Sequence, residues 1–338
     1  MASKLLSMRA AAVVLFALLL LVPLSGLNQY YLYIATLVLI HIILALGLNI
    51  LVGYAGQLAF ANAAMFGIGA YGVGLLQKHF GVPFWLGAPA GVLAAMAVGT
   101  MLALPALRLS GIYLALATLA FAQCTVWVMM HWISVTYGAS GFTIKAIDFA
   151  PLPIGSDHGM YYLSWICCVL LLVLARNTIQ SRIGRAFVAL RDHEIAAQSL
   201  GVNLLRYKAL AFAMSGFYAG VAGVLYAGVL SFVGPESFGL HQMVLQLAAI
   251  VIGGTASIAG SVLGGTLIVV IQEIVREFKF SMEIVFGALL ALFVLFKPTG
   301  LIDLVHLVRP GWREKLHAAG DEARAAEAPA AAAGERTA

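Results

Sequence analysis

The residues best equipped for chemistry in this chain gather in residues 176–208, a segment that we call the polar loop. Its middle reads Arg191, Asp192, His193 and Glu194, and apolar residues recur around these side chains at helical spacing. The loop also holds six of the 19 Lys and Arg residues. A loop that only connects two helices has no need of such an amphipathic arrangement. The pattern therefore predicts a surface that docks a partner.

Two short helices are expected inside the polar loop. The first is predicted over residues 184–191, and the second begins near Asp192, whose carboxylate can cap it. The second helix ends at Gly201, because glycine readily adopts the left-handed conformation that closes many helices. The small side chains of Ala196 and Ala197 leave room for another surface to approach closely.

Other kinds of chemistry have little support in the sequence. Cys124, Cys167 and Cys168 lie inside apolar runs without metal-ligand spacing, which predicts packing residues. The sequence contains no G-x-x-x-x-G-K-[ST] motif for binding ATP phosphates, and no cluster of His, Asp or Glu lies within an apolar run. We therefore expect no catalytic site, no metal and no cofactor of the chain's own. The net charge of +5 does not indicate a nucleic-acid partner. In a membrane protein the placement of Lys and Arg reports the orientation of the chain in the bilayer.

The composition predicts an all-α membrane protein, a polytopic helical bundle. Hydrophobic residues make up 62% of the chain and charged residues 10%, whereas soluble domains hold roughly 25% charged residues. The long apolar runs do not alternate in polarity, which favours transmembrane helices over barrel strands. About ten spans are expected, near residues 10–26, 31–52, 58–77, 84–104, 112–130, 159–175, 207–230, 241–255, 258–272 and 282–297. The first is expected to stay uncleaved, since no A-x-A-like site follows it.

The placement of Lys and Arg predicts the orientation in the membrane. With the N-terminus in the cytosol, fifteen of the 19 basic residues lie on the cytosolic side, including all six of the polar loop. This arrangement requires an even number of crossings and places the C-terminus in the cytosol as well. Residues 1–312 are expected to form the transmembrane domain, and residues 313–338, rich in Ala and Glu, a disordered cytosolic tail.

Two glycine-rich breaks interrupt the apolar segments, at residues 53–57 and 253–260. A single helix over 241–272 would place the Arg-rich C-terminus outside, against the charge rule. Two short helices meeting at the second break give ten crossings, and a re-entrant hairpin gives eight. Irregular backbone at membrane depth is tolerated only where protein buries it or where it lines a cavity. Interrupted helices at matching positions of two halves indicate a substrate path in transporters with internal repeats.

Polar residues and glycines at or near these depths are the candidates for a translocation path. They are Asn49, Gly53, Gly56, Gln57, Asn62, Gln123, Gln246, Gly253, Gly254 and Thr255. The alternative is that the amide side chains only form hydrogen bonds between helices. No Asp, Glu, Lys or Arg lies in the middle of a span, which argues against a carrier coupled to an ion gradient or an autonomous channel.

Nine short motifs lie along the chain. In the polar loop they are GRA at 184–186, ALRDHEIAA at 189–197 and LGVN at 200–203. Elsewhere they are GYAGQL at 53–58, FGIGAY at 66–71, LSGIYLA at 109–115, GPESF at 234–238, VIGG at 251–254 and GSVLG at 260–264. Taken together, these segments resemble the LivM-type permeases, the membrane subunits of branched-chain amino acid ABC importers. The motifs stand in the order of the family and extend over most of the chain.

The resemblance implies an importer of the bacterial cytoplasmic (inner) membrane. In such machines two related permease subunits pair, each inserts its loop into a groove of a cytosolic ATPase that binds the ATP, and a periplasmic binding protein delivers the solute. The residues that the resemblance assigns to ATPase coupling are Gly184, Arg185, Ala186, Leu190, Arg191, Asp192, Glu194, Ala196, Ala197 and Gly201. The lipid bilayer is the remaining partner.

The chain departs from the family pattern near both breaks. After Gln57 and Leu58 the family usually carries a Ser-Leu-Gly-His-like stretch, where this chain has Ala-Phe-Ala-Asn at 59–62. Ala256 stands where a glycine is usual. These departures leave the cargo open between branched-chain amino acids, other small apolar amino acids, urea, short amides and aromatic carboxylates.

Overall fold

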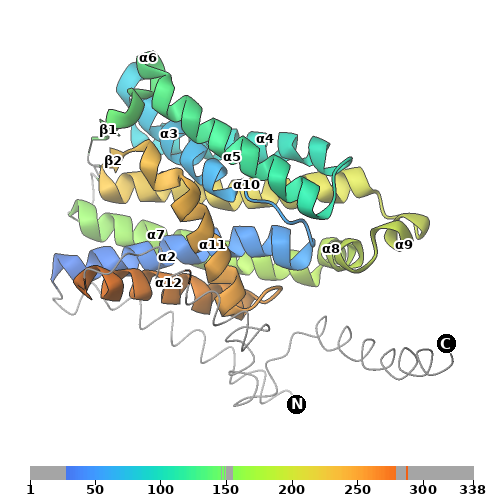
Figure 1. Ribbon diagram of the computed structural model, residues 1–338. Coiled ribbons are helices and arrows are strands. Elements are labelled where there is room, and N and C mark those ends of the chain that lie inside the picture. Colours follow the sequence, from blue (N-terminus) through green and yellow to red (C-terminus); the bar gives the residue numbers. More distant parts are fainter. Residues whose placement is uncertain (1–27, 146, 148, 150–154, 279–286, 288–338) are drawn as a thin grey trace, which may run out of the picture.

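The computed structural model describes residues 28–145, 147, 149, 155–278 and 287 (Figure 1). The long helices are α2 (Gln29–Asn49), α3 (Asn62–Phe80), α4 (Phe84–Ala106), α5 (Gly111–His131), α7 (Ser156–Gln180), α10 (Leu204–Leu230), α11 (Leu240–Gly253) and α12 (Ile258–Phe278). The polar loop supplies α8 (Arg182–Asp192) and α9 (Glu194–Ser199). Shorter elements are the π-helix η2 (Ile50–Tyr54), α6 (Ile133–Thr136) and the 3₁₀-helices η3 (Gly138–Ser140) and η4 (Pro235–Phe238).

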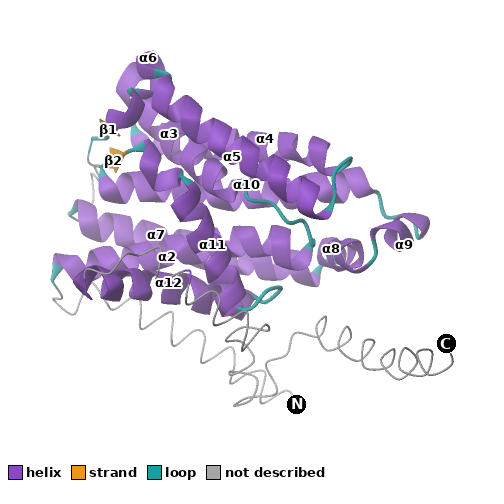
Figure 2. Ribbon diagram, in the orientation of Figure 1, coloured by secondary structure: helices purple, strands orange, loops and turns teal. Residues whose placement is uncertain are grey.

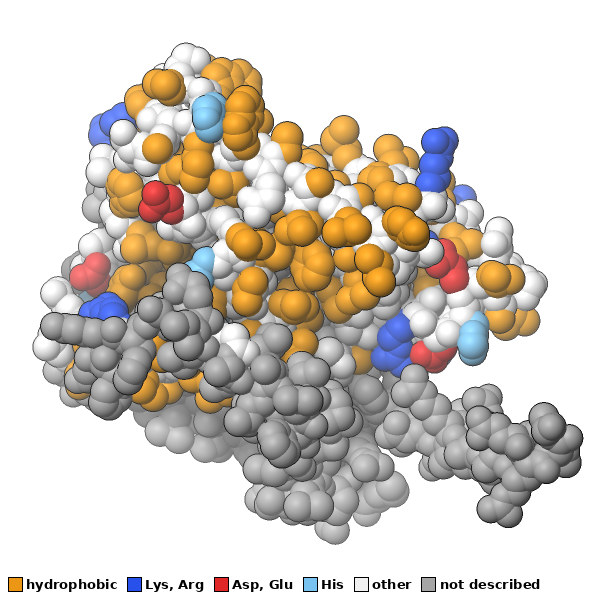
Figure 3. All heavy atoms as spheres, viewed as in Figure 1, with side chains coloured by type: hydrophobic (Ala, Val, Ile, Leu, Met, Phe, Trp, Pro, Cys, Tyr) orange, Lys and Arg blue, Asp and Glu red, His pale blue; other side chains and the backbone are white. Residues whose placement is uncertain are grey.

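Helices dominate the part of the chain that the structure describes (Figure 2). The strands β1 (Phe142–Thr143) and β2 (Phe232–Val233) form one short antiparallel pair, with Phe142 opposite Val233. Within the described residues, seven helical segments are long and apolar enough to cross a membrane. Figure 3 shows apolar side chains over the middle of the visible face and charged side chains toward its two ends. The predicted all-α polytopic fold is confirmed.

Glycines let α3, α4 and α10 pack backbone against backbone. A Cβ on Gly69 would lie 2.6 Å from the carbonyl oxygen of Gly220, and one on Gly91 would lie 2.7 Å from that of Gly69. Gly223 is closer still, since a methyl there would overlap the carbonyl oxygen of Phe66. Association of helices in lipid relies on such close packing, because the bilayer removes the hydrophobic difference between protein and solvent. These three helices form a closely packed cluster.

A second group of helices lies beside this cluster. The helices α2 and α12 pack antiparallel, with Gly265 against the backbone of Ile42, and α7 and α11 also contact α2. Figure 1 shows α8 and α9 at one end of the bundle and α6, β1 and β2 at the opposite end. The polar loop therefore projects beyond the helices, as its composition predicted.

The second glycine break separates two helices that turn back on each other. Residues 254–257 lie between α11 and α12, and the two helices pack together. The single-helix interpretation of 241–272 is thereby excluded, because Gly254 adopts a φ of 117° that no helix continues through. The predicted spans at 10–26 and 282–297 and the tail 313–338 lie outside the described residues. The number of crossings stays a prediction.

The boundaries inside the polar loop differ from those expected. Helix α8 begins at Arg182, two residues early, because the Ser181 hydroxyl accepts a hydrogen bond from the Ile183 N–H at 3.1 Å. The prediction that Asp192 caps the second helix is wrong. Asp192 is the last residue of α8, and His193 holds the N-cap position of α9 without a side-chain hydrogen bond. The Asp192 carboxylate instead pairs with the neighbouring Arg191 guanidinium. The left-handed Gly201 is confirmed by its φ of 86°.

The glycine packing of α3 and α10 makes a direct prediction about stability. We expect Gly223→Ala to destabilise the protein by about 1–3 kcal/mol, because its methyl overlaps the Phe66 carbonyl. Gly87→Ala in α4 is the matched control: its methyl would meet a Val73 methyl at 3.3 Å, which can shift slightly. Alanine also favours a helix over glycine by roughly 1 kcal/mol. Thermal unfolding in detergent compares the two, and equal midpoints would contradict the packing argument.

Candidate functional site

Buried residues hold the polar loop against the bundle. Phe187 and Leu190 on α8 are buried, and the Phe187 ring meets that of Tyr207 on α10 edge-on at 6.5 Å. A side chain on Gly184 would overlap the backbone of Ile179, so the tight start of α8 needs glycine. Of the residues predicted to couple to an ATPase, four are buried in this way: Gly184, Ala186, Leu190 and Ala197. These four residues pack within this chain, and their role in coupling to an ATPase stays a prediction.

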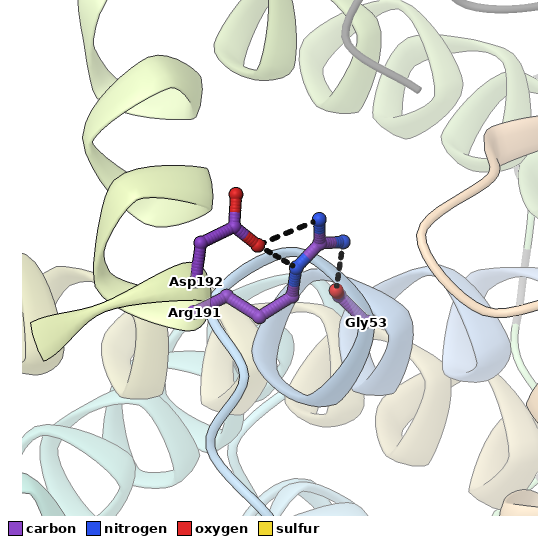
Figure 4. A network of polar contacts seen from close by, with 3 residues as sticks. All are labelled: Gly53, Arg191 and Asp192. Atoms are coloured by element: carbon purple, nitrogen blue, oxygen red, sulfur yellow. Dashed lines mark hydrogen bonds and ion pairs between the residues drawn. The ribbon is translucent and has the colours of Figure 1, made fainter. Parts of the chain in front are cut away.

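Arg191 joins the loop to the first glycine break (Figure 4). Its guanidinium donates a hydrogen bond to the carbonyl oxygen of Gly53 at 3.2 Å, and Asp192 orients it through contacts of 3.1 Å. Gly53 lies in η2, where the helix that began with α2 ends and leaves carbonyls without a helical partner. A Cβ on Gly56 would lie 2.6–2.9 Å from Arg191, so this contact also requires the glycine.

A second attachment runs through a buried lysine. Lys208 on α10 is 2% exposed, forms an ion pair with Glu194 on α9, and donates to the carbonyl oxygen of Ala106 at 2.9 Å. Ala106 is the last residue of α4, where the helix dipole favours a positive charge. The loop is therefore held at one point on η2 and at another on the ends of α4 and α10.

The outer face of the loop carries two apolar residues that the sequence did not single out as a site. Ile195 is 86% exposed and Leu200 is 85% exposed. Both belong to the apolar residues that recur with Phe187 and Leu190 at helical spacing. The chain turns at His193, so α9 exposes them, whereas α8 buries Phe187 and Leu190. Beside them is an open groove of about 1200 Å³, lined by residues of 192–205 and by Leu107 and Ser110 of the α4–α5 turn. Arg185, Asp192, Ala196 and Gly201 are exposed, and Glu194 is half-buried.

The two glycine breaks meet at Asn49, the last residue of α2. Its side-chain oxygen accepts a hydrogen bond from the Ala256 N–H at 2.8 Å. Its side-chain nitrogen donates to the Ser257 carbonyl at 2.8 Å and to the Ser261 hydroxyl at 2.7 Å. A Cβ on Gly53 would lie 2.5 Å from the Ala256 nitrogen, so the two backbones touch there. We call Asn49, Gly53 and residues 254–257 the junction.

The other candidate path residues divide into three groups. Asn62 accepts from the Ser215 hydroxyl and donates to the Gln246 side-chain oxygen, both at 3.0 Å, near the middle of α10. Gln57 is buried and contacts the Ala55 carbonyl at 3.3 Å, and Gly253 packs on Gly260. Gln123 and Thr255 are exposed and belong to neither hydrogen-bond network. Asn49, Asn62 and Gln246 therefore form hydrogen bonds between helices, and their role in a path stays a prediction.

A bundle of long apolar helices with a firmly held polar loop at one end defines a polytopic membrane protein. The chain belongs to the family described as branched-chain amino acid transport system / permease component, which matches residues 30–296. It is 34% identical over 313 residues to the high-affinity branched-chain amino acid permease protein LivM of Escherichia coli, covering 86% of this chain and 73% of the relative. The predicted LivM-type resemblance is confirmed.

More distant relatives extend the same picture. The chain is 28% identical over 281 residues to the permease protein LivH of Salmonella typhimurium, covering 78% of this chain and 91% of that protein. It is 22% identical over 328 residues to a probable LivM protein of Methanocaldococcus jannaschii, covering 82% and 94%. Each of these relatives is named as a permease of branched-chain amino acid transport.

The buried lysine predicts how the loop responds to substitution. We expect Glu194→Gln to weaken the attachment of α9 by about 1–3 kcal/mol, because Lys208 then keeps a buried charge without its ionic partner. Combining it with Lys208→Met should restore most of the loss, since neither charge remains. Hydrogen exchange of the α8 and α9 backbone amides measures the loss in the single variant and the recovery in the double variant. Arg206→Gln removes an exposed charge at the start of α10 and serves as control; additive losses in the double variant would argue against the pair.

Proposed function

We propose that this chain is the permease subunit of an ATP-driven importer of branched-chain amino acids, and that the polar loop docks a cytosolic ATPase. The observation that carries the proposal is the outward pair Ile195 and Leu200, on a loop held firmly at two points. Exposed apolar side chains on a polar projection indicate a protein interface. Beside them, the groove next to the α4–α5 turn offers a concave surface for the same partner.

The attachments of the loop suit a part that transmits force. The chain carries no P-loop motif, so the energy for transport has to come from another subunit. A partner that moves α9 would pull on η2 through Arg191 and on α4 and α10 through Lys208. Packed elements shift between discrete arrangements and do not deform continuously, so movement at the loop can reach the middle of the bundle.

Two further partners complete the proposed machine. The relatives include both LivM and LivH proteins, which supports pairing with a second, related permease in a heterodimer. A periplasmic binding protein would deliver the solute on the side of α6 and β2, opposite the polar loop. The excess of basic residues on the loop supports a cytosolic position for it and for both termini, in a bacterial cytoplasmic membrane.

The cargo is proposed from the relatives, whose names specify branched-chain amino acids. An interior without charged mid-span residues suits a small zwitterion with an apolar side chain. The alternative is the same machine carrying urea, short amides or aromatic carboxylates, because the chain departs from the family pattern at residues 59–62 and at Ala256.

Docking of an ATPase is tested by introducing charge on the outer face of α9. We expect Ile195→Asp combined with Leu200→Asp to lower co-purification of a P-loop ATPase at least about tenfold, since both apolar contacts are lost. Ile133→Asp is the matched control, because Ile133 is 72% exposed on α6 at the opposite end of the bundle. If the unsubstituted chain retained no ATPase, or the double variant retained it fully, the docking assignment would be wrong.

The cargo is tested on the assembled importer. We expect proteoliposomes containing this chain, its partner permease, the ATPases and the binding protein to accumulate leucine, isoleucine or valine when ATP is supplied. Excess urea, acetamide or benzoate should leave that uptake unchanged. Accumulation of one of these solutes in place of the amino acids would select the alternative cargo. Uptake by this chain alone under an ion gradient would instead indicate a secondary carrier.

A further inference from the structure

The junction connects three parts of the chain that are far apart in sequence. Arg191 of the polar loop contacts Gly53, Gly53 touches the backbone of Ala256, and Asn49 holds residues 256–257. The Arg191 link uses a half-exposed side chain, but a Cβ on Gly56 would also lie 2.8 Å from the Arg191 Cα, so the two backbones are close there. The other links involve backbone atoms or the buried Asn49 side chain, so a displacement of α8 can reach the turn between α11 and α12.

Asn49 is fully committed to this turn. It is 1% exposed, and its single amide accepts one hydrogen bond and donates two, all within 2.7–2.8 Å. Its three partners are Ala256, Ser257 and Ser261, so the side chain forms hydrogen bonds with both the turn and the first residues of α12. Asn62, by comparison, divides its two hydrogen bonds between two helices, through Ser215 on α10 and Gln246 on α11.

Two unusual backbone segments lie next to Asn49 in space. The segment that follows it is a π-helix, a form that occurs mostly as short stretches at functional sites. The turn that it holds contains Ala256 at a φ of 55°, a left-handed conformation that costs energy for any residue with a Cβ. The hydrogen bond from the Ala256 N–H to Asn49 helps to hold the turn in this strained conformation.

The two attachments of the loop act on different helices. Lys208 ties α9 to α4 and α10, which belong to the glycine-packed cluster, whereas Arg191 ties α8 to η2. Rotation of the loop about the first attachment would pull the second. The π-helix η2 and the α11–α12 turn would then shift relative to the glycine-packed helices α3, α4 and α10.

We propose that Asn49 is a positioning residue for transport, which carries movement of the polar loop to the α11–α12 turn. The inference rests on the proposed docking of an ATPase to that loop. Asn49 touches neither the ATPase nor, in this assignment, the solute. It acts by keeping the turn in register with η2, so its loss separates ATP hydrolysis from solute movement.

The test uses the complete importer in nanodiscs, with spin labels at Arg108 and Thr255, both exposed, and the three native cysteines replaced by alanine. We expect ATP to shift the distance between the labels in the parent and to leave it unchanged in Asn49→Leu. Uptake per ATP hydrolysed should fall about tenfold while hydrolysis continues. Asn49→Asp keeps the shape and the acceptor for the Ala256 N–H, so its values should be intermediate.

Matched variants separate this role from general packing. Asn62→Leu removes an equally buried amide from a different network and should keep the ATP-driven shift in distance. Loss of the shift in both variants, or a normal shift and normal uptake per ATP in Asn49→Leu, would overturn the inference. Failure of the parent to bind an ATPase would overturn the proposed function instead. The thermal unfolding midpoints of Asn49→Leu, Asn49→Asp and Asn62→Leu are compared with that of the parent. A large drop identifies a variant that loses activity by misfolding.

Discussion

A helix that ends inside a membrane protein leaves carbonyl groups that water cannot reach, and each must find another donor. In this chain that requirement is concentrated where α2 passes into η2. The Gly53 carbonyl receives the guanidinium of Arg191, and the space beside it is filled by the backbone of Ala256. Because one donor comes from the polar loop and one neighbour from the α11–α12 turn, satisfying the end of a single helix fixes the relative position of three segments.

The same constraint explains why glycine occupies the contact positions. Gly53 and Gly56 leave no room for a Cβ once Arg191 and Ala256 are in place. A larger residue at either position would separate the loop from the turn, even where the helix itself tolerated it. The glycines between α3, α4 and α10 serve a different purpose, since they bring whole helices together and make a rigid body against which the junction can shift.

Hydropathy and charge were sufficient to predict the helical bundle, the separation of α11 from α12 and the projection of the polar loop. These properties depend on the composition of long segments, because insertion into the bilayer requires long apolar runs and the placement of Lys and Arg sets their orientation. Which side chains of the short helices α8 and α9 are buried and which are exposed could not be predicted in the same way. Leu190 and Ile195 are both apolar and lie five residues apart, yet the turn at His193 buries one and exposes the other. Nothing in the local pattern specifies that turn, because it is set by Arg191 and Glu194 meeting residues far away in sequence.

The hydrogen-bond partners of the buried amide side chains were also beyond prediction from the sequence. Asn49, Asn62 and Gln246 are all expected to find hydrogen bonds, and they do. The sequence cannot show that Asn49 directs all three of its hydrogen bonds to residues 256–261, since these partners lie more than 200 residues away. The departure at Ala256 adds to this point. With a Cβ at a left-handed position, the turn is less stable by itself than it would be with glycine, by roughly 1 kcal/mol. The hydrogen bond from its N–H to Asn49 offsets a cost of that size, so this chain depends on Asn49 more than one with glycine at position 256 would.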